Sequence, residues 1–165
     1  MELTGLREMF VDQLKDLYSA EKQIVKALPK MARKCNSRKL AQAFESHLEE
    51  TKAQIDRLEG IFEHLDVPAR AKKCKGMEGL IEEGQELMSE AEGDALDAAL
   101  VAAAQKVEHY EIAGYGTVRT YARLLGDDWS ANLLQQTLDE EGRTDKKLTD
   151  LAESEINLQA VEQHV

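Results

Sequence analysis

Apolar side chains recur every three or four residues along five stretches of the chain, which is the spacing of one face of an α-helix. The pattern predicts helices over about residues 4–34, 38–65, 77–90, 94–125 and 129–155, followed by a loosely held tail over residues 156–165. Ser37 is placed to cap the start of the second helix, Gly126 is placed to end the fourth, and one of the two aspartates after Gly126 is placed to cap the start of the fifth. Pro29 lies inside the first helix, where its missing N–H predicts a kink or break near Ala27.

The lengths of the connections indicate how these helices are arranged. The turns after residues 34 and 125 are short, whereas the connection between the 38–65 and 94–125 helices is long and contains the short 77–90 helix. In a four-helix arrangement a long connection favours a crossover over a tight hairpin. We therefore predict an all-α, up-down four-helix bundle with a crossover and one short extra helix, forming a single domain over residues 1–165.

Three of the predicted helices carry a glutamate in the centre of an apolar stripe. Glu111 lies between Val107 and Tyr115 on one helical face, and Glu21 and Glu141 occupy similar central positions in the 4–34 and 129–155 helices. An ionised carboxylate that is buried alone costs several kcal/mol or takes up a proton. These side chains therefore need partners inside the bundle.

The acidic positions also repeat between the two halves of the chain. Glu21 and Glu50 are 29 residues apart, and Glu111 and Glu141 are 30 residues apart. Two hairpins related by an approximate twofold axis would bring these four carboxylates to one level, where oxygen ligands suit Fe, Mn, Mg or Ca. This is the arrangement of the ferritin-like di-metal bundles. The predicted metal ligands are Glu21, Glu50, Glu108, Glu111, Glu141, Asp145 and Gln54.

Other polar residues flank this set and are interpreted as outer partners, namely His47, Tyr18 and Tyr115. His47, three residues before Glu50, is alternatively a nitrogen ligand in place of the missing histidines. The Glu-x-x-His pairs of di-metal bundles are missing, because Ala53 and Thr144 stand three residues after Glu50 and Glu141. The predicted site is therefore poor in histidine and rich in oxygen. Each role has an alternative. The carboxylates could face solvent or form ion pairs between helices instead of binding metal, and the tyrosines could only pack in the core. Gln54 could donate a hydrogen bond to a metal ligand instead of binding the metal itself.

The composition limits the expected partners and compartment. The formal net charge of −11 argues against nucleic acid or an anionic membrane as a partner. No apolar run approaches the roughly 18 residues that span a bilayer, and the N-terminus lacks the features of a secretory signal. Cys35 and Cys74 are isolated thiols, which favours a reducing cytoplasm over a disulfide framework but leaves a single bond between them open.

Four motifs coincide with the predicted carboxylates: Asp16-Leu17-Tyr18-Ser19-Ala20-Glu21, Glu45-Ser46-His47-Leu48-Glu49-Glu50-Thr51, Val107-Glu108-His109-Tyr110-Glu111-Ile112-Ala113-Gly114-Tyr115 and Leu134-Gln135-Gln136-Thr137-Leu138-Asp139-Glu140-Glu141. They resemble motifs of the YciE/YciF-type bacterial ferritin-like family, and the resemblance covers about residues 6–152. It implies a ferritin-like fold with one extra short helix, a homodimer, a di-metal site and an association with bacterial stress responses.

Two functions of different classes are compatible with these features. The first is a stress-linked protein with two metal ions per chain, iron in preference to manganese, that reacts with O2 or peroxide; in it Glu21, Glu50, Glu111 and Glu141 bind the metals. The second is a non-enzymatic structural or interaction dimer whose metal only stabilises the bundle. The sequence assigns no catalytic residue and leaves open whether the protein is an enzyme.

Overall fold

The computed structural model describes residues 2–162, and these residues form helices and no strand. The elements are α1 (Leu6–Lys34), α2 (Arg38–His64), α3 (Lys75–Glu90), α4 (Gly93–Leu124), α5 (Asp128–Leu151), the π-helical turn η1 (Ala152–Ile156) and α6 (Asn157–Glu162). None of the described helices is both long enough and apolar enough to cross a membrane.

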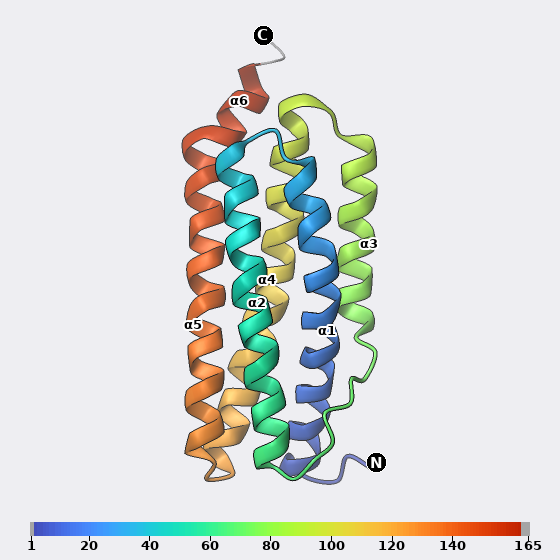
Figure 1. The fold of residues 1–165 in the computed structure, drawn as a ribbon, viewed down its shortest axis with the longest axis vertical. Coiled ribbons are helices and arrows are strands. Elements are labelled where there is room, and N and C mark those ends of the chain that lie inside the picture. Colours follow the sequence, from blue (N-terminus) through green and yellow to red (C-terminus); the bar gives the residue numbers. More distant parts are fainter. Residues whose placement is uncertain (1, 163–165) are drawn as a thin grey trace.

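The long helices α1, α2, α4 and α5 run side by side along the bundle (Figure 1). α1 and α2 form one antiparallel hairpin, and α4 and α5 form the other. α2 and α4 run in the same direction, because residues 65–74 return along the side of the bundle and α3 then packs against α1 and α4. The predicted all-α bundle, with a crossover and one short extra helix, is confirmed.

The helix ends follow from local capping interactions. The Ser37 side chain accepts a hydrogen bond from the backbone N–H of Leu40, and the Asp127 side chain accepts one from that of Ser130. Between α4 and α5, Gly126 has a φ of 76°, the left-handed conformation that glycine adopts without strain. These are the caps that the sequence predicted.

The structure differs from the sequence prediction at two points on the helices. α1 is continuous from Leu6 to Lys34, so the break expected near Ala27 does not occur; Pro29 removes one N–H, and the buried Ile24 and Leu28 hold the helix on the core. The expected tail from residue 156 is helical up to Glu162, because the buried Ile156 keeps η1 packed on the core. Residues 163–165 of that tail lie outside the described residues.

The apolar core consists of two separate clusters, one in each half of the bundle. The first is built around Ile24, Phe44, Leu100 and Leu148, among others. The second is built around residues such as Leu14, Leu58, Val118 and Leu134. Every long helix carries buried polar side chains near the level where the two clusters meet: residue 21 on α1, 47–54 on α2, 108–111 on α4 and 137–141 on α5. A buried polar layer therefore crosses the middle of the bundle.

Both cysteines are free thiols. Cys35 is partly buried at the end of α1, and Cys74 is buried at the start of α3. The Cys74 Sγ lies 3.0 Å from the hydroxyl of Tyr110, which donates a hydrogen bond of 2.6 Å to Asp16. The structure therefore resolves the question that the sequence left open, since the two sulfur atoms are not bonded to each other.

Candidate metal centre

Acidic side chains from three helices and a histidine from a fourth converge in the polar layer. They are Glu21 on α1, His47 on α2, Glu108 and Glu111 on α4, and Glu141 on α5, and each is at most 3% exposed. Ligand atoms of Glu21, Glu111 and Glu141 lie within 4.8 Å of one another, and so do those of His47, Glu108 and Glu141. The result is two adjoining three-residue clusters that share Glu141.

Most carboxylate oxygens in these clusters lack a hydrogen-bond partner within the described part of the chain. Both oxygens of Glu111 and of Glu141 are buried and unpaired, and so is one oxygen each of Glu21 and Glu108. The Nε2 atom of His47 lies 2.9 Å from Glu108 Oε1, but the direction is not that of a hydrogen bond. Because buried polar groups in folded proteins are nearly always paired, so many unpaired oxygens at one place make this layer a candidate site for a cation.

Burial and mutual repulsion control the protonation of these carboxyl groups. Burial raises the pKa of Glu21 to about 7, although the Tyr115 hydroxyl, which donates a hydrogen bond of 2.5 Å to Glu21 Oε1, favours the charged form. The pKa values of Glu111 and Glu141 are raised well above 4.5, first by burial and then by the neighbouring carboxylates. Without a cation these groups hold protons that a bound cation would displace.

The structure buries His47 within the cluster and leaves Glu50, a predicted ligand, at the edge of the cluster. Glu50 is 41% exposed, and its Oε2 atom accepts a hydrogen bond from Thr144 and lies 3.6 Å from His47 Nδ1. Burial opposes charging of His47, but the carboxylate of Glu108 outweighs it and raises the pKa of the imidazole. The contact with His47 lowers the pKa of Glu50. Glu50 thus lies beside Nδ1 of His47, while Nε2 of the same ring faces the cluster. Outer carboxylates occupy this position at metal-binding histidines.

Two further predicted residues make their contacts away from the cluster. The Asp145 carboxylate lies 3.1 Å from Nε2 of the exposed His109 and accepts a second hydrogen bond from Gln105. The Tyr18 hydroxyl donates a hydrogen bond of 2.6 Å to the exposed Glu59, and its ring packs against Phe62. Neither side chain belongs to the two clusters.

Gln54 belongs to an interhelix ion pair that the sequence analysis missed. The Arg57 guanidinium donates two hydrogen bonds, of 2.7 and 2.6 Å, to Glu140, and it also donates one to Thr137. Gln54 donates to the same carboxylate at 3.0 Å, while its own Oε1 atom is buried and unpaired. Arg57 lies seven residues after Glu50 on α2, so the polar row through residues 47, 50 and 54 continues to it, and this spacing could have revealed the pair.

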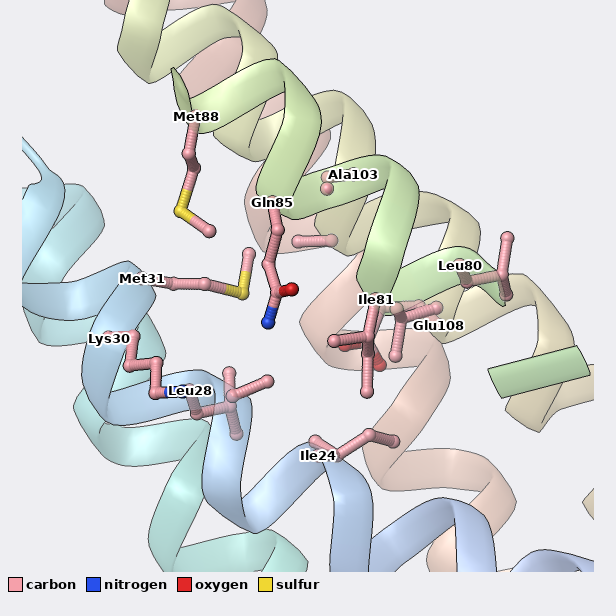
Figure 2. A pocket seen from close by; sticks show the side chains of 14 residues that line it. Ile24, Leu28, Lys30, Met31, Leu80, Ile81, Gln85, Met88, Ala103 and Glu108 are labelled. Atoms are coloured by element: carbon pink, nitrogen blue, oxygen red, sulfur yellow. The ribbon is translucent and has the colours of Figure 1, made fainter. Parts of the chain in front are cut away.

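The clusters can be approached from two sides, and Glu108 lines both approaches. A polar pocket between α2 and α5 reaches His47 and Glu108, and its lining includes the charged residues Glu50, Arg143 and Lys147. An apolar pocket between α1, α3 and α4 also reaches Glu108, past Ile81 and Ile24 (Figure 2). The cluster therefore borders one polar pocket and one apolar pocket.

The fold and this layer define a class of protein, namely all-α bundles with a buried centre of carboxylates and histidine. The family model described as "Domain of unknown function (DUF892)" matches residues 5–161. The chain is 49% identical over 162 residues to Protein YciF of Escherichia coli, and the match covers 97% of this chain and 98% of that protein. The chain therefore belongs to the DUF892 family, and the predicted relationship to the YciF proteins is confirmed.

Solved structures agree with this assignment. The crystal structure of the Escherichia coli stress protein YciF matches with a TM-score of 0.90 at 50% identity, covering 94% of this chain and 99% of that one. YcfI of Rhodopseudomonas palustris, proposed to be a structural protein, matches with a TM-score of 0.88 at 42% identity over 90% and 95% of the two chains. A protein of Xanthomonas campestris, at 24% identity and a TM-score of 0.79 over 98% and 100% of the chains, shares the fold.

Proposed function

We propose that this chain is a stress-associated protein that holds two metal ions, iron in preference to manganese, in its buried cluster and reacts with O2 or peroxide. The observation that carries the proposal is the set of six buried carboxylate oxygens without a hydrogen-bond partner in the described residues. Two divalent cations offset the negative charge and use the free oxygens as ligands.

The geometry supports a specific division of the ligands. Glu21, Glu111 and Glu141 would hold one ion, His47 and Glu108 would hold the other together with Glu141, and the shared Glu141 would bridge the two. Carboxylate oxygens with an imidazole nitrogen are a ligand set that suits Fe2+ and Mn2+. Such metals, when bound, supply the electrons for reduction of O2 or peroxide.

The remaining groups of the centre act by orienting these ligands. The hydrogen bond from Tyr115 fixes the Glu21 carboxylate, and Glu50 faces the ring of His47 from the polar pocket. The predicted ligands Glu50, Gln54 and Asp145 lie outside the two clusters. We propose that they contribute to the metal centre from its periphery and not as direct ligands.

A titration with Mn2+, followed by calorimetry and electron paramagnetic resonance, tests the division of ligands. We expect about two ions per chain in the wild type, neither ion in Glu141→Gln, and one ion in Glu21→Gln, since Glu21 belongs to a single cluster. Asp139→Asn is the matched control and keeps both ions, because this exposed carboxylate on the same helix accepts a hydrogen bond from Gln135 and lies outside the cluster. Equal binding by the wild type and Glu141→Gln would contradict the proposal.

A purely structural role for the metal is the second candidate, and the description of YcfI favours it. The presence of a single histidine in the cluster also favours a site that binds metal without turning over substrate. The two functions differ in a measurement of O2 and peroxide consumption by iron-loaded protein. If the protein reacts with an oxidant, the wild type consumes O2 or peroxide and Glu111→Gln does not. If the metal is only structural, it raises the melting temperature, and the wild type consumes no more oxidant than Glu111→Gln.

We also propose that the protein is a cytoplasmic homodimer. The free thiols Cys35 and Cys74 support a reducing compartment. An apolar patch at the junction of α4 and α5 supports self-association, since Leu124, Leu125 and Trp129 are 71%, 41% and 49% exposed. Size-exclusion chromatography coupled to light scattering should give the molecular mass of two chains for the wild type. The variant Leu124→Glu should give the molecular mass of one chain. A monomeric wild type would contradict the dimer.

A further inference from the structure

The apolar pocket between α1, α3 and α4 is a cavity that the packing of small residues leaves open. Ala27, Gly84, Ala103 and Ala104 contribute to its lining, and a Cβ atom added to Gly84 would lie 3.3 Å from that of Ala103. The void measures about 40 Å³, which exceeds the roughly 10–15 Å³ that one water molecule requires. Because its walls are almost entirely apolar, the void is suited to a hydrocarbon group and not to water.

The mouth of this pocket continues into an open basic groove. Lys30, Gln85 and Met88 line both the pocket and the groove, and Arg33 and Lys34 line the groove beyond them. The three basic side chains of the groove, Lys30, Arg33 and Lys34, make no ion pair with the residues that the structure describes. In a chain of net charge −11, they form a local positive surface beside an apolar cavity.

Adaptable side chains stand at the junction between the pocket and the groove. Met31 and Met88 point toward each other across the opening, with Gln85 beside them (Figure 2). Unbranched thioether side chains change rotamer readily and accommodate apolar ligands of different shape. The narrow void can therefore widen when an alkyl chain enters.

We propose that the pocket and the groove together bind a medium-chain carboxylate. Its alkyl chain occupies the apolar pocket, and its carboxylate contacts Lys30, Arg33 and Lys34 in the groove. The charge and the polarity of the two parts match the two ends of such a ligand, and a neutral or cationic amphiphile lacks one of these matches. The far end of the chain then lies beside Glu108, at the edge of the candidate metal centre. Binding itself does not depend on the metal.

Methionine NMR tests the proposal with probes that the chain already contains. We expect octanoate, added to protein labelled with 13C in its methionine methyl groups, to shift the signals of Met31 and Met88. Met9, near the start of α1, and Met77, at the start of α3, line neither cavity and should not move. Shifts of all four signals, or of none, would overturn the proposal.

The same titration separates the contributions of the chain and of the head group. Each methylene added from butanoate to octanoate should strengthen binding about fourfold, as expected for burial of a CH2 group. Octanol and octylamine should bind at least tenfold more weakly than octanoate. The double variant Lys30→Glu/Arg33→Glu should weaken octanoate binding about tenfold or more, whereas Lys52→Glu, a change on α2 outside both cavities, should weaken it less than twofold.

Two further outcomes would contradict the site. If Met88→Trp, which fills the mouth, bound octanoate as tightly as the wild type while keeping the same circular dichroism spectrum, the chain would not enter this pocket. If anionic phospholipid vesicles bound the protein and free octanoate did not, the groove would recognise a membrane surface instead. Repeating the octanoate titration with metal-free protein distinguishes this proposal from the metal proposal, because octanoate binding should persist without metal.

Discussion

Replacement of Glu21 by glutamine should remove a measurable part of the pH dependence of folding in metal-free protein. Burial raises the pKa of Glu21 from 4.5 to about 7 in the folded state. Between these values the folded state binds more protons than the unfolded state, so the free energy of unfolding falls as the pH rises. At about 1.4 kcal/mol per pKa unit, the free energy of unfolding falls by about 3 kcal/mol as the pH rises from 4.5 to above 7.

Glutamine has the same shape as glutamate and keeps an oxygen that can accept the hydrogen bond from Tyr115, but it does not ionise. The free energy of unfolding of Glu21→Gln, relative to the wild type, should therefore rise by about 3 kcal/mol from pH 4.5 to pH 8. Urea unfolding in the presence of a chelator measures this difference at each pH.

Glu59→Gln is the matched control, because Glu59 also accepts a hydrogen bond from a tyrosine but is exposed to solvent. Its difference from the wild type should stay within about 0.5 kcal/mol over the whole range. If the free energy of unfolding of Glu21→Gln changed with pH in parallel with that of the wild type, the carboxylate of Glu21 would not be buried without a compensating charge.

Three other predictions concern the same layer and the helices around it. Binding of Mn2+ at pH 6.5 should release at least about one proton per chain, seen as a binding enthalpy that depends on the buffer; a buffer-independent enthalpy would contradict it. Arg57→Leu should lower the free energy of unfolding by about 3 kcal/mol in urea, because Glu140 would stay buried without its partner, and a loss below about 1 kcal/mol would count against this. Gly116→Ala should raise the free energy of unfolding by about 0.5–1 kcal/mol, because its Cβ meets no atom within 4 Å, whereas Gly76→Ala should lower it, because Tyr110 lies 2.7 Å from the added Cβ.

The central carboxylates could be located from the sequence because they interrupt apolar stripes. Glu21, Glu111 and Glu141 stand at positions that helical periodicity turns toward the core, and the structure buries all three. Glu108 lies one turn before Glu111 on α4 and is buried with it. Periodicity sufficed here because each of these helices has a wide apolar face that fixes its rotation.

The sequence could not decide between residues at the edge of a helical face. His47 and Glu50 flank the apolar stripe of α2, and the rotation of the helix about its axis determines which of them enters the core. That rotation depends on packing against α1 and α5, and it buries His47 and leaves Glu50 at 41% exposure. Asp145, also predicted as a ligand, follows Glu141 by four residues, which turn a helix by about 40° more than one revolution, and its carboxylate contacts His109.

The continuous polar layer also depends on contacts between helices that lie far apart in the sequence. Arg57 and Glu140 are separated by 83 residues, and only the pairing of α2 with α5 brings them together. The apolar pocket beside Glu108 likewise depends on the position of α3, which the sequence places only as a short amphipathic helix on a long connection.

The most direct test of the metal centre is a crystal structure of the protein grown with Mn2+, with diffraction data collected to locate manganese by its anomalous scattering. We predict two anomalous peaks, one among Glu21, Glu111 and Glu141 and the other among His47, Glu108 and Glu141. Peaks confined to surface carboxylates, with the buried oxygens facing only one another or water, would contradict it.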